Sequence, residues 1–115
     1  MVKHIAAAVI ETLEDDKAEE LLVIDLEGKS SIADQMIIAS GRSQRHVAAL
    51  AEHVTRRIKD DGYGGARVEG LPNADWVLID TGDIIVHLFR PEVRAFYNLE
   101  RIWGTEATDH RNSAN

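Results

Sequence analysis

The chain has 115 residues, a mass of 12.8 kDa and a formal charge of −7, from 13 Lys and Arg against 20 Asp and Glu. This length accommodates one domain, which we expect over residues 1–103, followed by a disordered polar tail over 104–115. The acidic balance argues against DNA or other nucleic acid as the main partner, because phosphate binding depends on Lys and Arg, and it favours a basic partner. The absence of Cys excludes disulfides, thiolate metal sites and thiol nucleophiles.

No apolar run approaches the roughly 20 residues of a membrane span. The first four residues lead into an amphipathic stretch without the apolar block of a signal peptide. We therefore expect a cytoplasmic protein with no membrane partner.

The first half of the chain predicts a helix, two strands and a second helix. Helical spacing of apolar residues begins at Ile5 and predicts a helix over about 2–17. Residues 21–26 and 36–39 are short apolar runs, typical of strands that are covered on both faces. Ser43 is a suitable N-cap for the next helix. The apolar residues of that helix share one narrow arc: Val47, Leu50, Ala51, Val54 and Ile58.

The second half predicts a short strand, a hairpin and a last helix. Residues 66–69 could form a short strand, and residues 76–80 and 83–89 form strand-like runs around Thr81-Gly82, typical of a tight β-hairpin. Pro91 suits the first turn of a helix that we expect to continue to Trp103. The order is α-β-β-α-β-β-β-α, so we predict an α/β (α+β) fold with a mixed five-stranded sheet flanked by helices.

The histidines do not suggest a metal site. His46 and His53 lie seven residues apart on the second predicted helix, a rise of about 10.5 Å that one zinc ion cannot span. His87 lies in an apolar strand, alternating with Ile85 and Phe89, and we interpret it as a hydrogen-bonded sheet residue. We expect neither a metal nor another cofactor.

Nucleophilic and phosphate-binding motifs are absent as well. The segment 40–43 lacks the Gly-x-Ser-x-Gly elbow, and neither nucleotide-binding glycine motif occurs. The turn at Gly41 either holds an anion on the amides of a helix start or is only a turn with a helix cap. Asp80 and Asp83 flank the hairpin turn with the wrong parity for two metal-bridging carboxylates on one strand. We therefore expect no catalytic residue and no enzyme.

Excess apolar surface near the C-terminus is the most informative feature. The apolar residues of the last predicted helix spread over about 220° of its circumference, more than the roughly 100° needed to dock one face. Trp76 opens its strand directly after a turn, where burial is hard to complete, and Trp is favoured at protein interfaces. This surface is explained either by contact with another protein or a second copy, or by Trp76 and Trp103 closing the core of a small domain.

Several sequence blocks together resemble the Iojap family of bacterial ribosomal silencing factors. The match runs from about residue 5 to Trp103, and each block alone is weak. The blocks are DLEGKSSIAD at 25–34, MIIASGRSQRHV at 36–47, EG at 69–70, ADWVLID at 74–80, GDIIVH at 82–87 and RAFYNLERIW at 94–103.

This resemblance implies a nucleotidyltransferase-like fold and a non-enzymatic role. A protein of this family docks on large-subunit ribosomal protein fourteen, blocks joining of the ribosomal subunits and represses translation when nutrients are limiting, and free members are often homodimers. The partner-binding residues that the matching blocks imply are Trp76, Val77, Leu78, His87, Phe89, Tyr97 and Trp103.

One enzymatic alternative remains open at this stage. A metal-dependent nucleotidyl transferase could use Asp80, Asp83 and the turn at Gly41. That turn is only loosely similar to the nucleotide-binding turn of such enzymes, and the acidic pair that should follow it is missing. We interpret the pattern as a lost active site, because function depends on the site and not on the fold.

Overall fold

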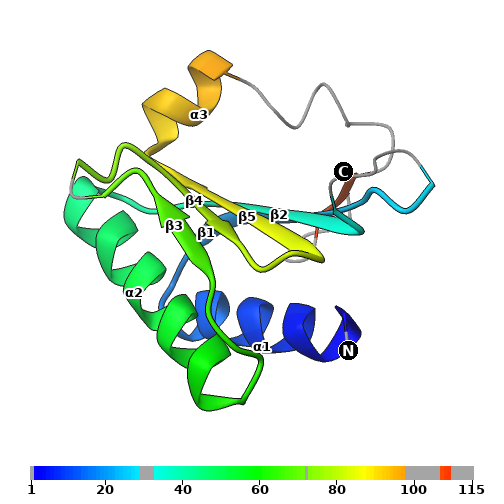
Figure 1. Cartoon of the computed structure of the whole chain (residues 1–115). Coiled ribbons are helices and arrows are strands. Elements are labelled where there is room, and N and C mark those ends of the chain that lie inside the picture. Colours follow the sequence, from blue (N-terminus) through cyan, green and yellow to red (C-terminus); the bar gives the residue numbers. More distant parts are fainter. Residues whose placement is uncertain (1, 29–32, 72, 98–106, 110–115) are drawn as a thin grey trace.

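A computed structural model of the chain describes residues 2–28, 33–71, 73–97 and 107–109. Six strands form one sheet in the order β3-β4-β5-β2-β1-β6 (Figure 1). The elements are α1 (Val2–Asp15), β1 (Glu19–Asp25), β2 (Gln35–Ser40), α2 (Gln44–Asp60), β3 (Arg67–Glu69), β4 (Trp76–Asp80), β5 (Ile84–Phe89), α3 (Pro91–Tyr97) and β6 (Ala107–Asp109).

The sheet is mixed, as the sequence predicts. β2 and β5 run parallel, with Ile38 opposite His87, whereas every other neighbouring pair is antiparallel. β4 and β5 form the predicted hairpin, in which Trp76 lies opposite Phe89. The five predicted strands and their order among the helices are confirmed.

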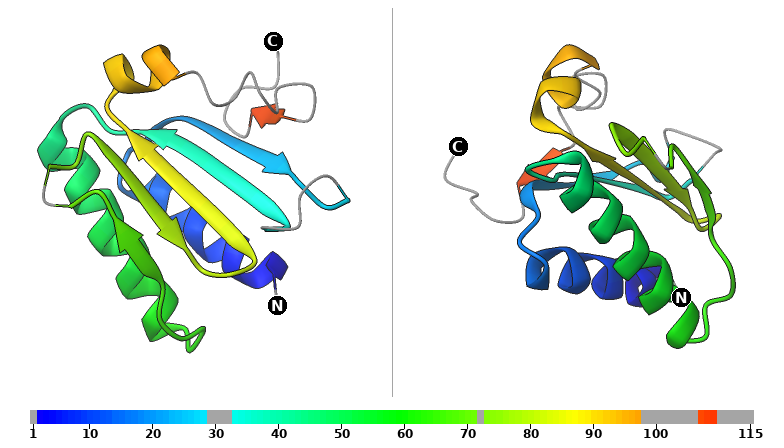
Figure 2. Two further views of the ribbon diagram at one scale, coloured as in Figure 1. Left: turned by 45° about the horizontal axis from the view of Figure 1, so that its top comes forward. Right: turned by 90° about the vertical axis from the view of Figure 1, so that its left-hand side faces the viewer.

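The two faces of the sheet are covered differently. α1 and α2 lie side by side against one face, and the short α3 lies at the other (Figures 1 and 2). The core between the two long helices and the sheet is built from aliphatic side chains, including all five apolar residues predicted for α2. Each fully buried aliphatic side chain stabilises the fold by about 1.5–3 kcal/mol, so this layer holds the domain together.

Polar contacts cap α2 and attach it to Asp16, directly after α1. Ser43 caps α2 as predicted, because its hydroxyl oxygen accepts from the backbone N–H of His46 at 3.1 Å. The ring Nε2 of His46 lies 2.8 Å from the carbonyl oxygen of Asp16, and His53 contacts the Asp16 carboxylate. The two histidines of α2 therefore serve helix packing.

Three predicted boundaries change. The first helix ends at Asp15 and not at 17, because the chain turns at Lys17, whose φ is +67°. The last helix is described only from Pro91 to Tyr97, and the rest of its predicted range lies outside the described residues. Within the predicted tail, Ala107–Asp109 form β6 beside β1, a strand that we did not predict from the sequence. Three residues are too few to show a period of two in the sequence.

The described helices contain no segment that is both long and apolar enough for a transmembrane span. The division into a domain over 1–103 and a tail stays a prediction.

A candidate protein-binding surface

The residues of β4 alternate between the two faces of the sheet. Val77 and Ile79 are fully buried in the core beneath α1 and α2. Trp76 and Leu78 point to the opposite face and are only half-buried. This alternation follows from the two-residue period of a strand, and it places an indole on the face that the long helices leave uncovered.

Three rings gather on that face. The ring centroids of Trp76 and Phe89 lie 5.0 Å apart, and those of His87 and Phe89 lie 5.9 Å apart with nearly parallel planes. Phe89 and His87 are buried, whereas Trp76 stays half-buried, with Leu78 beside it. Ile85, also half-buried, packs against the same cluster. We call the set of Trp76, Leu78, Ile85, His87 and Phe89 the aromatic patch.

A hydrogen bond between two side chains fixes the arrangement of the patch. The indole Nε1–H of Trp76 donates to Nδ1 of His87 at 2.9 Å. Because an indole nitrogen only donates, Nδ1 must accept, and the neutral imidazole carries its proton on Nε2. Burial lowers the pKa of His87 to about 4, so the ring is neutral at physiological pH and the acceptor at Nδ1 is retained.

The turn before β4 positions Trp76 at the start of the strand. The backbone N–H of Ala74 donates to the carbonyl oxygen of Gly70 at 2.9 Å. Gly70 has a φ of +104°, and a Cβ there would lie 2.1 Å from the carbonyl oxygen of Trp76. Only glycine fits this position. The result is a hollow lined by Glu69, Gly70, Trp76 and Leu78 at the β3 edge of the patch.

Charged side chains border the patch at two places. At the start of β4, Asp75 Oδ1 accepts from Arg90 Nε and from Gln44 Nε2, each at 2.8 Å, and Arg90 also reaches Glu92. These hydrogen bonds, Gln44 first, lower the pKa of the Asp75 carboxyl group. At the other place, Arg67 lies 3.4 Å from Glu69 and 3.6 Å from Asp80. Among the described residues, these two groups contain four carboxylates and two guanidinium groups.

The structure separates the residues that the sequence proposed together. Trp76 and Leu78 are partly exposed on the patch, whereas His87 and Phe89 form its floor, where they support Trp76 and have almost no surface of their own for a partner. Val77 has no exposed surface and faces the helices, so its side chain is not available to a partner in this fold. The side chain of Tyr97 and all of Trp103 lie outside the described residues.

Sequence reasoning missed two contributors. It placed Gly70 only in the block at 69–70, although Gly70 lets the backbone approach Trp76, and it did not connect Ile85 with the indole. The strand period could have found Ile85, since it shares the parity of His87. Leu71, next to Gly70, is 47% exposed and is the one large apolar residue counted as exposed in the described part of the chain.

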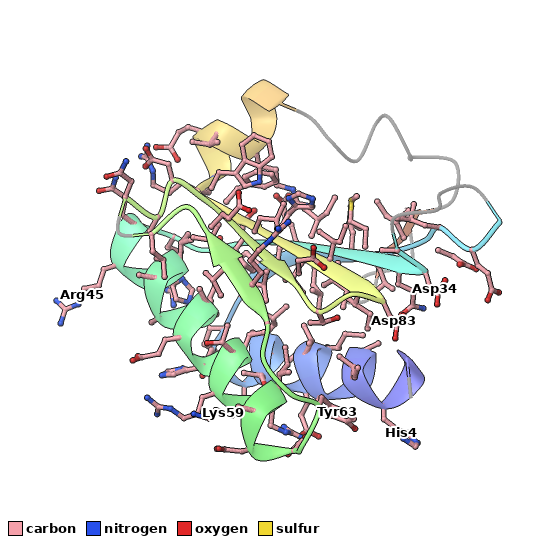
Figure 3. The ribbon with its side chains drawn as sticks, viewed as in Figure 1. His4, Asp34, Arg45, Lys59, Tyr63 and Asp83 are labelled. Carbon is pink, nitrogen blue, oxygen red and sulfur yellow. The ribbon has the colours of Figure 1, made fainter. Side chains whose placement is uncertain are left out.

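The residues of the enzymatic alternative do not converge. The backbone N–H of Gly41 donates to the carbonyl oxygen of Phe89, at the end of β5. Asp80 and Asp83 lie at the beginning of β5, about 17 Å away along the strand. Figure 3 shows Asp83 beside Asp34 at that other end of the sheet. Within the described ranges, no three His, Cys, Asp or Glu side chains gather as metal ligands. The structure therefore contradicts a shared nucleotidyl-transfer site.

The turn at Gly41 is accounted for by packing. A Cβ at this position would lie 2.8 Å from a methyl carbon of Val47. The N–H of Arg42 already donates to Nδ1 of His46 at 2.9 Å, and the N–H of His46 donates to the cap at Ser43. These contacts favour a turn with a helix cap over an anion site.

A mixed sheet with two long helices on one face and an aromatic patch with a polar border on the other defines a candidate protein-binding domain. The chain belongs to the family described as ribosomal silencing factor during starvation, whose sequence pattern matches residues 2–115. The family resemblance drawn from the sequence blocks is confirmed.

Individual relatives agree with this assignment. The chain is 62% identical over 96 residues to the ribosomal silencing factor RsfS of Zymomonas mobilis subsp. mobilis, covering 84% of this chain and 72% of that protein. It is 39% identical over 103 residues to RsfS of Bacillus subtilis, covering 90% and 85%. A crystal structure of a protein from Chromobacterium violaceum superposes with a TM-score of 0.88 at 34% identity, covering 100% of this chain and 97% of that one.

Proposed function

We propose that this ribosomal silencing factor docks on large-subunit ribosomal protein fourteen through the aromatic patch. Occupying that protein blocks joining of the small subunit and represses translation when nutrients are limiting. The single observation that carries the proposal is the half-buried indole of Trp76, held on the face of the sheet that α1 and α2 leave uncovered. Large aromatic side chains that are partly exposed and held in place are typical anchors of protein interfaces.

The border of the patch supports a basic partner. In the part of the border that the structure describes, four carboxylates and two guanidinium groups leave an excess of negative charge beside an apolar centre. The chain as a whole carries −7. Such complementarity speeds the approach of a basic protein and disfavours bare RNA.

The proposal requires no catalysis and no cofactor, because steric occupation is sufficient to prevent subunit joining. It places the protein in the cytoplasm, where ribosomal subunits meet. We further propose that the free protein is a homodimer that buries the same patch, so that the dimer and the ribosome compete for it.

The test is co-sedimentation of the chain with purified large subunits, followed by subunit joining measured by light scattering. Truncating a buried interface Trp costs about 2 kcal/mol or more, so Trp76→Ala should weaken binding by roughly 30-fold. It should also restore joining that the wild-type chain inhibits.

The matched control is Arg45→Ala. Arg45 is exposed on α2 and projects away from the sheet (Figure 3), and this variant should bind like the wild type. Equal binding by Trp76→Ala and the wild type would reject the patch, and no binding by the wild type would reject the function. If large subunits bind intact dimers, the proposed competition between dimer formation and ribosome binding is wrong.

A further inference from the structure

The indole of Trp76 has one polar atom, and a side chain of the protein itself already satisfies it. Nε1–H donates to Nδ1 of His87 at 2.9 Å across the β4–β5 pair. His87, which provides the acceptor, is 6% exposed, and its ring stacks on the ring of the fully buried Phe89. This packing limits the movement of the His87 ring. Because the only polar atom of the indole is used in this bond, the solvent-exposed part of the Trp76 side chain consists of carbon atoms.

We propose that His87 is a positioning residue that turns the indole N–H of Trp76 inward, and that the partner therefore meets Trp76 with an apolar recess that contains no hydrogen-bond acceptor for it. This inference rests on the proposed function for its second half, because the partner is the one assigned there. The first half concerns the free protein and stands without any partner.

The choice of histidine over other strand residues supports this role. β5 is otherwise apolar, and at the centre of a strand facing the patch an aliphatic side chain would pack as well. Histidine instead supplies an acceptor, and burial keeps it neutral by lowering its pKa to about 4. A leucine at this position would leave the indole N–H at the floor of the patch without its acceptor, which carries a desolvation cost when the surface is covered.

The inference predicts how a substitution of Trp76 by Phe affects binding, because Phe keeps the apolar ring but lacks the N–H. If the partner presents hydrocarbon to Trp76, then Phe can replace Trp76 with moderate loss, because most of the buried apolar area is kept. If the partner accepts a hydrogen bond from the indole, then Phe is nearly as harmful as Ala. Comparing Trp76→Phe with Trp76→Ala therefore distinguishes an apolar recess from one that contains a hydrogen-bond acceptor, even when the residues of the partner's recess are not known.

The experiment first examines the free protein by NMR, at a dilution at which the chain is monomeric, so that a second copy does not cover the patch. The Trp76 indole proton, assigned as the resonance that Trp76→Phe removes, should show slow solvent exchange in the wild type. His87→Asn places an amide oxygen near the position of Nδ1 and should retain slow exchange. His87→Leu should speed exchange at least tenfold. Fast exchange in the wild type, or unchanged exchange in His87→Leu, would overturn the positioning role. Unfolding curves of all variants show that these comparisons are made on folded protein.

The second part is a double-mutant cycle for binding to large subunits. His87→Leu should weaken binding about fivefold or more when residue 76 is Trp, and less than twofold in the Trp76→Phe background, because Phe needs no acceptor. His87→Asn should restore binding to within about twofold of the wild type. Equal losses in both backgrounds would mean that His87 acts by touching the partner or by general stability, and would contradict the inference.

The two failures are distinguishable. If the exchange data hold but Trp76→Ala binds large subunits as well as the wild type, the proposed function fails and the positioning role survives. If Trp76→Ala abolishes binding and Trp76→Phe is equally damaging, the proposed function survives and the apolar recess is wrong.

Discussion

Two neighbouring residues of β4 show how differently the two faces of one sheet are built. Ile79 is fully buried beneath α1 and α2, among aliphatic side chains. Leu78 is half-buried on the other face, beside an indole and an imidazole that are hydrogen bonded to each other. The first face is closed by a continuous aliphatic layer beneath two long helices, whereas at β4 the second face combines apolar area with a hydrogen bond between two ring side chains. We infer that the first face carries the main core, whereas the second face, which buries a smaller cluster around Ile38 and Phe89, presents a surface along β4.

The largest expected loss of stability comes from a substitution in the core beneath α1 and α2. Ile79→Ala leaves a cavity in a close-packed layer, and such substitutions cost about 2–5 kcal/mol of the free energy of unfolding. Leu78→Ala, one residue away on the other face, should cost less than about 1.5 kcal/mol, because Leu78 is already partly solvated. Urea denaturation of both variants measures the difference, and equal losses would show that the two faces do not differ in this way.

A pH effect on stability should come from His87 in the patch. The pKa of His87 is about 4 in the folded protein and about 6.5 in an unfolded chain. Between these values the unfolded state binds the proton and the folded state does not, so the free energy of unfolding rises with pH. The contribution is complete above about pH 6.5 and is lost as the pH falls toward 4, on the order of 3 kcal/mol in all.

Urea denaturation at a series of pH values measures this effect. The wild type should lose stability more steeply than His87→Leu between pH 6.5 and 4.5, by up to one proton per molecule. Parallel curves for the two proteins would contradict the burial of a neutral His87. The acidic groups that both proteins share contribute equally to the two curves.

A smaller effect sharpens the role of the turn that positions Trp76. Gly70→Ala introduces a Cβ 2.1 Å from the carbonyl oxygen of Trp76 at a φ of +104° and should cost about 2–3 kcal/mol of stability. Gly82→Ala, in the hairpin turn, has a similar φ of +98° but open space around the new Cβ, so about 1 kcal/mol is expected. Thermal unfolding of the pair separates steric contact from backbone conformation, and similar losses would remove the close approach at Gly70 from the account.

The sequence predicted the elements well because periodicity determines them locally. The arc of α2 from Val47 to Ile58 and the hairpin around Thr81-Gly82 are both present where the patterns indicated. The parity of β4 was equally visible, yet grouping Val77 with Trp76 by sequence block ignored that neighbours on a strand point to opposite faces. What periodicity could not supply is the pairing of strands distant in the chain. The addition of β6 to β1 depends on that pairing. The bond between Trp76 and His87 lies inside the predicted hairpin and depends on side-chain geometry, which periodicity does not specify either.

The most direct test of the docking surface is site-specific photo-crosslinking to purified large subunits. A photoreactive amino acid would replace Leu78 on the patch in one protein and Arg45 on the outer side of α2 in another. The account predicts a covalent product between position 78 and ribosomal protein fourteen, and none from position 45. A product with that protein from position 45 alone, or with only a different ribosomal protein from position 78, would contradict it.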